Sequence, residues 1–284
     1  MNNMMRMYAV LGDPIGHSMS PVMHNAAFES LGMPDRYHAF RVPISDLRDA
    51  IYGAKALGFG GLNLTIPLKE EALKYVDPDP IASKIGAVNT IDFKGGIRGY
   101  NTDGIGALRA LEDAGVNVAD RTVMIIGAGG AARAIAFQLA YSGGRIVIAN
   151  RTLDRAERLA HDVGMGLSEL GKTLSTSIKS IGLDMIESEI ADADILINAT
   201  SVGMHPDIDA IPIPPDLLRP ELVVFDIVYN PRYTKLLSES EKRGAITIDG
   251  VQMLVHQGAE AFFIWTGRAP PEGVMREAVI RELL

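Results

Sequence analysis

Short apolar, β-branched runs alternate with segments of helical period along the chain, and this alternation predicts an α/β protein. In the first part of the chain, strands are expected at 7–11, 37–42 and 61–64, helices at 21–31, 44–57 and just after Pro67, and a hairpin around Gly95 and Gly96. The pattern is typical of a layered structure with helices packed on a sheet.

A helix expected to begin near Gly104 leads into a second series of buried strands. These strands are predicted at 122–126, 145–149, 194–199, 222–227 and 245–248. Helices between the earlier strands favour a mostly parallel, doubly wound sheet of the Rossmann type.

Apolar residues from Val251 to Trp265 recur at helical spacing, and a last helix runs to Leu284. No strand follows these helices, so we expect them to pack back on the first domain. The 284 residues allow two domains of ordinary size. We place a substrate-binding and catalytic domain at 1–104, completed by helices at 251–284, and a Rossmann domain at 105–250.

The segment 164–188 is polar, rich in Gly and Ser and weakly patterned. We expect it to be a connecting region of the second domain that carries no chemistry.

Charge and composition exclude several classes of partner. With 27 Lys and Arg against 35 Asp and Glu, the net charge is −8, and no basic block suggests nucleic acid. No apolar run approaches the roughly 18 residues of a membrane span, and the N-terminus reaches Gly12, Asp13 and Pro14 too soon for a signal peptide, so we expect a cytoplasmic protein. The absence of cysteine rules out disulfides and thiol catalysis. The six histidines show no metal-binding spacing, and we expect no metal site.

The strongest local signal is the turn Gly127-x-Gly129-x-x-Ala132, which follows a predicted strand and opens a predicted helix. Gly127 permits a tight turn, Gly129 lets the backbone approach a pyrophosphate, and Ala132 permits close packing of helix on strand. Any short turn favours glycine. The flanking strand and helix nevertheless favour nucleotide binding over a purely structural turn.

The residues after the next strand indicate which nucleotide binds. Enzymes that use NAD usually carry Asp or Glu there, whereas this chain has Asn150, Arg151 and Thr152, with Arg155 one turn later. A guanidinium favours a 2′-phosphate, so NADP(H) is the expected cofactor. Alternatively, Thr152 simply caps the next helix, expected at 153–163, while the arginines are solvated. Both interpretations can hold together.

Four polar clusters of the first domain are candidates for chemistry, at 16–21, 61–69, 87–90 and 99–104. Each has an ordinary structural explanation when taken alone. Ser20 could be a helix N-cap before Pro21, Lys69 could be a solvated charge, and the other two clusters could be simple turns.

Nine motifs in chain order change this interpretation. They are His17-Ser18-x-Ser20-Pro21, Asn63-x-Thr65-x-Pro67-x-Lys69, Ala87-Val88-Asn89-Thr90, Asn101-Thr102-Asp103-Gly104, the glycine turn, Asn150-Arg151-Thr152, Asn198-x-Thr200-Ser201-x-Gly203-Met204, Asp226-x-x-Tyr229-x-Pro231 and Met253-x-x-x-Gln257. Their order and approximate spacing resemble the shikimate dehydrogenases of the shikimate/quinate dehydrogenase family over essentially the whole chain. The resemblance implies NADPH-dependent, reversible reduction of 3-dehydroshikimate to shikimate in the chorismate pathway of aromatic amino-acid biosynthesis.

The resemblance also implies roles for single residues. Lys69 and Asp103 match the family's catalytic pair. The implied substrate ligands are Ser18 and Ser20 for the carboxylate, Thr65, Asn89, Asp103 and Gln257 for the ring hydroxyls, and Tyr229 from the nucleotide domain. The implied cofactor contacts are Gly127, Ala128, Gly129, Gly130, Ala131, Asn150, Arg151, Thr152, Arg155, Ile227 and Gly250. The stretch Asp-Pro-Asp-Pro at 77–80 departs from the helix that many relatives continue, so no cofactor contact is assigned there.

Elementary chemistry agrees with these roles. Hydride transfer to a ketone creates an alkoxide, which needs a proton donor within hydrogen-bond reach. Lys69 can be that donor, and an ionised Asp103, which only accepts hydrogen bonds, can orient it.

The sequence is compatible with a homodimer. Two rival functions also remain open. One rival is a quinate or dual quinate/shikimate dehydrogenase, against which the arginine-rich NADP site argues modestly. The other is a noncatalytic module that senses a nucleotide and a small acid, against which the retained Lys69 and Asp103 argue.

Overall fold

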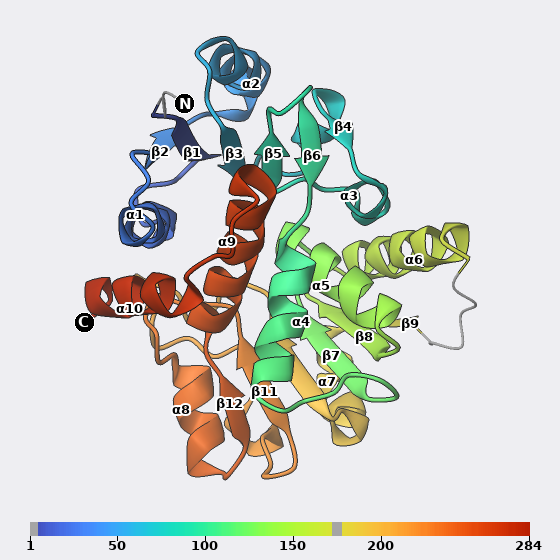
Figure 1. Ribbon diagram of the computed structural model, residues 1–284. Coiled ribbons are helices and arrows are strands. Elements are labelled where there is room, and N and C mark those ends of the chain that lie inside the picture. Colours follow the sequence, from blue (N-terminus) through green and yellow to red (C-terminus); the bar gives the residue numbers. More distant parts are fainter. Residues whose placement is uncertain (1–4, 172–177) are drawn as a thin grey trace. The chain divides into compact units, whose positions relative to one another are not determined.

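The computed structural model describes residues 5–171 and 178–284, and the chain divides into two compact units. Unit 1 comprises Met1–Asp103 and Val255–Glu282 with Leu284, and unit 2 comprises Gly104–Leu254 with Leu283. Each unit contains one six-stranded sheet (Figure 1).

The sheet of unit 1 mixes parallel and antiparallel strands. In chain order the strands are β1 (Met7–Gly12), β2 (Arg36–Arg41), β3 (Gly61–Leu64), β4 (Asp77–Pro78), β5 (Thr90–Asp92) and β6 (Arg98–Tyr100), arranged as β2-β1-β3-β5-β6-β4. Strand β1 runs parallel to β2 and β3, while β5 is antiparallel to both β3 and β6. The hairpin predicted around Gly95 and Gly96 is therefore confirmed as β5–β6. The two-residue β4 was missed because so short a strand has no alternation to detect.

The helices of unit 1 are α1 (Ser20–Ser30), α2 (Leu47–Ala56), α3 (Pro80–Ile85) and α10 (Glu272–Glu282), with short 3₁₀ turns η1 (Ile44–Asp46) and η2 (Glu71–Lys74). Helix α3 starts afresh at Pro80 because the Asp79 side chain accepts a hydrogen bond from the Ala82 N–H at 2.7 Å. The Asp-Pro-Asp-Pro stretch at 77–80 therefore supplies the N-cap of α3.

The C-terminal helices return to unit 1, as predicted. Helix α10 packs against α1 (Figure 1). Trp265 lies near the end of α9 (Gly250–Thr266), and its indole N–H donates to the Ile91 carbonyl at 2.9 Å. An aromatic cluster surrounds this contact, consisting of Tyr8, His24, Phe28, Tyr37, Phe262 and Trp265. All six side chains are buried.

The sheet of unit 2 is parallel throughout. Its strands are β7 (Thr122–Ile126), β8 (Arg145–Asn150), β9 (Ile178–Gly182), β10 (Ile195–Asn198), β11 (Val223–Asp226) and β12 (Ile246–Ile248), arranged as β12-β11-β10-β7-β8-β9. Numbered from β7, this is the strand order 6-5-4-1-2-3 of the dinucleotide-binding fold. The doubly wound sheet predicted from the sequence is confirmed.

The helices that accompany this sheet are α4 (Asp103–Asp113), α5 (Gly130–Tyr141), α6 (Leu153–Glu169), α7 (Ile186–Glu189) and α8 (Lys235–Lys242), with 3₁₀ turns η3 (Leu183–Met185), η4 (Ile190–Asp192) and η5 (Pro215–Leu217). Helices α5 and α6 pack on each other and on β8, and α8 packs on β11 and β12 (Figure 1). The aliphatic core of unit 2 lies among these layers.

The expectation that 164–188 is a connecting region was wrong. Helix α6 continues through it to Glu169, and the segment also supplies the edge strand β9 and helix α7, while 172–177 lie outside the described residues. An edge strand needs few apolar side chains, and in β9 only Ile181 is buried. The segment therefore has too few buried apolar positions for its sequence pattern to predict a strand.

Within the described ranges, no helix is both long enough and apolar enough to cross a membrane.

Candidate functional site

Lys69 and Asp103 form an ion pair in unit 1. Lys69 follows β3, and its carbonyl accepts the Val88 N–H at 2.8 Å. Asp103 opens α4 directly after β6, where its N–H donates to the Asn101 side-chain oxygen at 3.1 Å. The Lys69 Nζ lies 2.6 Å from Asp103 Oδ2, and the two side chains are only 15% and 7% exposed. Lys69 is thus not the solvated charge that its local sequence would allow.

Asn89 binds the other oxygen of the same carboxylate. Its Nδ2 donates to Asp103 Oδ1 at 2.9 Å, while its Oδ1 accepts the Thr102 backbone N–H at 2.8 Å. A backbone N–H can only donate, so the amide has one possible orientation and its nitrogen must face Asp103. Both oxygens of Asp103 then accept hydrogen bonds, as an ionised carboxylate does.

Ser18 and Ser20 lie together at the start of α1. The Ser20 N–H donates to Ser18 Oγ at 3.4 Å. Ser20 is the first residue of the helix, and Met19 occupies the N-cap position without a side-chain capping bond. The alternative in which Ser20 merely caps this helix is therefore incorrect. Ser20 is largely buried, and its side chain opposes the rise that burial causes in the pKa of Tyr37.

Thr65 and Gln257 also belong to unit 1. Thr65 follows β3, and its N–H donates to the Leu11 carbonyl at 2.9 Å. Gln257 lies on α9 and is partly buried. The sequence-based role of each residue as a substrate ligand stays a prediction.

The glycine turn between β7 and α5 has the conformation that a phosphate loop requires. Gly127 has φ +115°, and a Cβ there would meet the Ala199 carbonyl oxygen at 2.9 Å, so only glycine fits. Gly129 occupies the N-cap position of α5, with no atom within 4 Å of where its Cβ would lie. The neighbouring Ala128, Gly130 and Ala131 are partly exposed, and Ala132 is buried. The N-terminus of α5 therefore has space beside Gly129 and no side-chain cap, which are features of a helix end that can bind an anion.

The loop between β8 and α6 holds two exposed arginines. Arg151 and Arg155 form no ion pair with the residues that the structure describes, and both are exposed. Asn150 shapes the loop because its Nδ2 donates to the Thr152 carbonyl at 2.9 Å. Thr152 is at the N-cap position of α6, but its side chain makes no capping bond. Capping therefore does not explain this threonine, and both guanidinium groups are free to bind a phosphate.

Ile227, Tyr229 and Gly250 lie where the chain leaves β11 and where α9 begins. A Cβ on Gly250 would meet the Ile227 carbonyl oxygen at 2.5 Å, so this start of α9 requires glycine. Ile227 and Tyr229 follow β11 directly.

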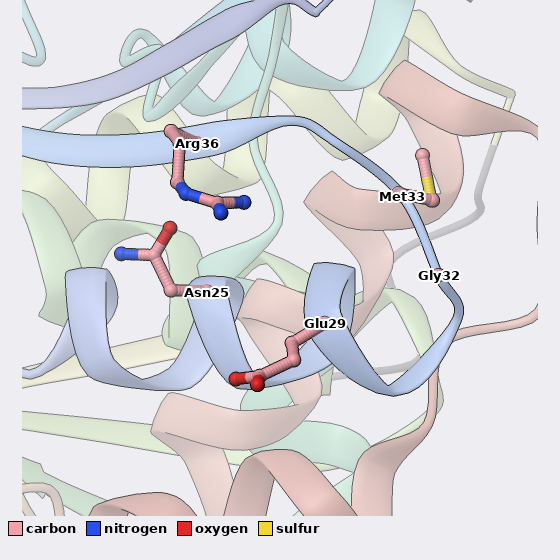
Figure 2. Close-up of a pocket in the computed structure, with 5 residues that line it drawn as sticks. All are labelled: Asn25, Glu29, Gly32, Met33 and Arg36. Atoms are coloured by element: carbon pink, nitrogen blue, oxygen red, sulfur yellow. The ribbon is translucent and has the colours of Figure 1, made fainter.

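Within the described ranges, no three His, Cys, Asp or Glu side chains are grouped closely enough to hold a metal ion. Figure 2 shows a hollow of unit 1 between α1 and β2, lined by Asn25, Glu29, Gly32, Met33 and Arg36. It contains none of the site residues predicted from the sequence.

Comparison with known proteins places the whole chain in one family. The shikimate dehydrogenase substrate binding domain matches residues 10–91, the shikimate/quinate 5-dehydrogenase family matches 109–254, and the shikimate 5′-dehydrogenase C-terminal domain matches 250–280. A shikimate dehydrogenase (NADP(+)) from Methanococcoides burtonii is 55% identical over 280 residues, which cover 99% of each chain. The chain belongs to the shikimate dehydrogenase family.

Solved shikimate dehydrogenases share the fold of this chain. A crystal structure of one in complex with NADP+ is 47% identical, with a TM-score of 0.92 over 99% of this chain and 96% of that one. A shikimate 5-dehydrogenase from Thermus thermophilus in complex with NADP(H) and shikimate is 38% identical, with a TM-score of 0.86 over 98% of this chain and 100% of that one. The resemblance drawn from the nine motifs is confirmed.

Three polar residues around this shikimate dehydrogenase site received no role from the sequence. Asn63 Nδ2 donates to Thr90 Oγ1 at 3.0 Å, and Thr90 Oγ1 donates to Asn89 Oδ1 at 2.9 Å. The Tyr37 hydroxyl donates to Asn63 Oδ1 at 2.7 Å. Asn63 and Thr90 stand inside family motifs, and a polar residue within an otherwise apolar strand was the available signal. Tyr37 gave no signal, because an aromatic residue in a strand is ordinarily core.

A second buried carboxylate organises the nucleotide unit of this family member. Asp226 accepts from Asn198 Nδ2 at 2.9 Å, from the Val228 N–H at 3.0 Å and from Thr234 Oγ1 at 2.7 Å. Burial raises the pKa of Asp226 to about 6, although these three donors oppose the rise. The bond to Val228 shapes the backbone just before Tyr229. Asp226 and Asn198 belong to family motifs, but the sequence assigned them no role.

Proposed function

We propose that this chain catalyses the NADP-dependent, reversible reduction of 3-dehydroshikimate to shikimate in aromatic amino-acid biosynthesis. The observation that carries the proposal is the shielded Lys69–Asp103 pair, with Nζ 2.6 Å from Oδ2. A general acid–base pair of this kind is what carbonyl reduction needs. Its presence in a member of the shikimate dehydrogenase family indicates a functioning enzyme.

Lys69 handles the proton in the proposed reaction. Its ammonium has three donors, of which one is held by Asp103, so the other two can reach the carbonyl oxygen of the substrate. As that oxygen gains negative charge, Lys69 donates a proton to it. In the reverse direction the neutral amine takes the proton from the hydroxyl. Asp103 stabilises the ammonium form and fixes its direction.

The remaining polar residues of unit 1 bind and orient the substrate in this proposal. Ser18 and Ser20 bind the carboxylate, and Asp103 and Asn89 bind ring hydroxyls beside the reacting carbon. Thr65 and Gln257 are further ligands from unit 1, and Tyr229 of unit 2 is another. The bond from the Ser20 N–H to Ser18 Oγ supports the first assignment, because it holds the Ser18 hydroxyl at the start of α1, where Ser20 also lies.

The residues of unit 2 fit NADP(H). Open space beside Gly129 and the N–H groups of α5 suit a pyrophosphate, and the unpaired guanidinium groups of Arg151 and Arg155 suit a 2′-phosphate. When bound, NADPH supplies the hydride. Ala128, Gly130 and Ala131 complete the phosphate loop in this proposal. Asn150, Thr152, Ile227 and Gly250 are further contacts.

The direct test is the oxidation of NADPH by purified protein with 3-dehydroshikimate. The same protein should be assayed with quinate and NAD. We expect rapid turnover with the first pair and little with the second. Higher kcat/KM with quinate and NAD would favour the quinate dehydrogenase. Tight binding of both ligands without turnover would favour the noncatalytic module and overturn the proposal.

The cytoplasmic location and the homodimer stay predictions from the sequence. Fractionation of cells that produce the protein tests the first. Sedimentation of the purified protein tests the second, and a mass twice that of the chain would support the dimer.

A further inference from the structure

Tyr37 is fixed from two directions by consecutive residues of α1. Asn25 exchanges two hydrogen bonds with the Tyr37 backbone, since its Nδ2 donates to the carbonyl at 2.9 Å and its Oδ1 accepts the N–H at 2.9 Å. Figure 2 shows the Asn25 side chain directed from its helix toward the strand that carries Arg36. The ring of His24 stacks on that of Tyr37, with centroids 4.4 Å apart and planes at 15°. The Tyr37 side chain therefore has a single available position.

The hydroxyl at the end of this fixed ring joins two parts of the site. It donates to Asn63 Oδ1 at 2.7 Å, and the Ser20 side chain is close enough to oppose the rise that burial causes in the pKa of Tyr37. Ser20 is a proposed ligand of the substrate carboxylate. Asn63 leads through Thr90 to Asn89, which holds Asp103. The buried chain of hydrogen bonds thus runs through Tyr37, Asn63, Thr90, Asn89, Asp103 and Lys69.

The orientation of the Asn63 amide is determined by its partners. Asn63 Nδ2 donates to the Asn89 carbonyl at 3.1 Å, and a carbonyl can only accept. The other end of the amide, Oδ1, must therefore face Tyr37. The phenol is the donor there, and burial keeps it protonated by raising the pKa of Tyr37 well above its ordinary value. No other hydrogen bond to Asn63 Oδ1 is seen among the described residues.

We infer that Tyr37 is a positioning residue for catalysis, whose hydroxyl orients the amide network that aims Lys69. This inference rests on the proposed function. Without the hydroxyl, Asn63 Oδ1 loses its donor and becomes an unpaired buried acceptor. Asn63 keeps the two bonds of its Nδ2, but its amide is held from one end only, which loosens the bond that it donates to Thr90 beside Asn89.

Tyr8 provides a matched control in the same unit. It is buried like Tyr37 and belongs to the same aromatic cluster, where it stacks on Phe28 with centroids 5.3 Å apart. The charged groups that act on its hydroxyl are Asp35, Arg6 and Asp92, and it takes no part in the chain of hydrogen bonds above. Tyr37→Phe and Tyr8→Phe each remove one buried hydroxyl, but only the first removes it from the site.

The experiment compares wild type, Tyr37→Phe and Tyr8→Phe by steady-state kinetics with shikimate and NADP. We expect Tyr37→Phe to raise the KM for shikimate up to about tenfold and to lower kcat by about threefold to tenfold, as the loss of one buried hydrogen bond implies. The KM for NADP should be unchanged. Tyr8→Phe should leave all three constants within about twofold of wild type. Equal kinetic changes in the two variants, or none in Tyr37→Phe, would overturn the inference.

A second measurement does not depend on turnover. Hydrogen exchange of the Asn63 side-chain amide, followed by NMR, should be accelerated in Tyr37→Phe and unchanged in Tyr8→Phe. An inactive wild type whose Asn63 amide responds in this way would refute the proposed function and retain the positioning of Asn63 by Tyr37. An active wild type whose Asn63 amide is unaffected by Tyr37→Phe would refute the inference alone.

Discussion

Asn89 donates from Nδ2 to Asp103 Oδ1 at 2.9 Å, on the oxygen that Lys69 does not use. The carboxylate is therefore held from both sides, and rotation of Asp103 would break one bond or the other. This arrangement points the lysine without requiring contact between Lys69 and Asn89.

Replacement of Lys69 should abolish most catalysis without unfolding the protein. We expect Lys69→Ala to lower kcat by about two to four powers of ten, the usual contribution of general acid–base catalysis. NADPH binding, measured by fluorescence titration, should be nearly unchanged. Lys74→Ala is the control, because Lys74 is exposed and pairs with Glu71 at 2.8 Å, outside the proposed site. Normal turnover in Lys69→Ala would remove Lys69 from the mechanism.

Cofactor selectivity should depend on Arg151. Arg151→Ala is expected to weaken NADPH binding by about 1.5–3 kcal/mol, the range for hydrogen bonds to charged groups, and to leave NADH binding nearly unchanged. Arg158 is also exposed and lies further along α6, so Arg158→Ala is a matched control. Calorimetry gives the dissociation constants of both cofactors. Equal losses of affinity for NADPH and for NADH would contradict a contact between Arg151 and the 2′-phosphate.

Asp226 should make the protein more stable as the pH falls from about 6 toward 3.8. Burial raises the pKa of Asp226 from 3.8 to about 6 in the folded protein. Between these values the folded state holds a proton that the unfolded state has lost, so unfolding becomes harder with acid, by at most about 1.4 kcal/mol per pH unit. Urea unfolding at several pH values should show this contribution in wild type and not in Asp226→Asn. Identical pH slopes in the two proteins would contradict it.

His24 should act in the opposite direction. Burial lowers the pKa of His24 from 6.5 to about 3, and its ring nitrogens have no hydrogen-bond partner among the described residues. Between pH 6.5 and about 3 the unfolded state binds a proton that the folded state excludes, so His24 makes stability fall with acid. His24→Phe keeps an aromatic ring beside Tyr37 and should flatten this part of the pH dependence. An unchanged slope would show that His24 is not the neutral buried group described here.

Much of the fold could be predicted because its signals are local. The Rossmann strands β7, β8, β10, β11 and β12 are short, largely apolar runs, and the glycine turn at Gly127 stands between a strand and a helix, the context that indicates a nucleotide loop. Strand β9 could not be predicted, because an edge strand is recognised by its partner β8 rather than by its own sequence. The same limit applies to β4.

Site residues could be predicted where a family motif includes them. They could not be predicted where only tertiary contacts bring a residue to the site. Lys69 and Asp103 are 34 residues apart, and only the fold brings them to 2.6 Å. Asn63 stands in a family motif, but the hydrogen bond that it accepts from Tyr37 joins β2 to β3. No spacing in the sequence reveals a hydrogen bond between elements that pair through tertiary structure.

The most direct test of the proposed reaction is the transfer of deuterium from NADPH labelled at the reactive carbon of the nicotinamide to 3-dehydroshikimate. Mass spectrometry of the product is the measurement. The proposed mechanism predicts shikimate that carries one deuterium for each NADPH consumed, formed by wild type and scarcely at all by Lys69→Ala in the same time. NADPH consumption without labelled shikimate, or equal labelling by wild type and Lys69→Ala, would contradict it.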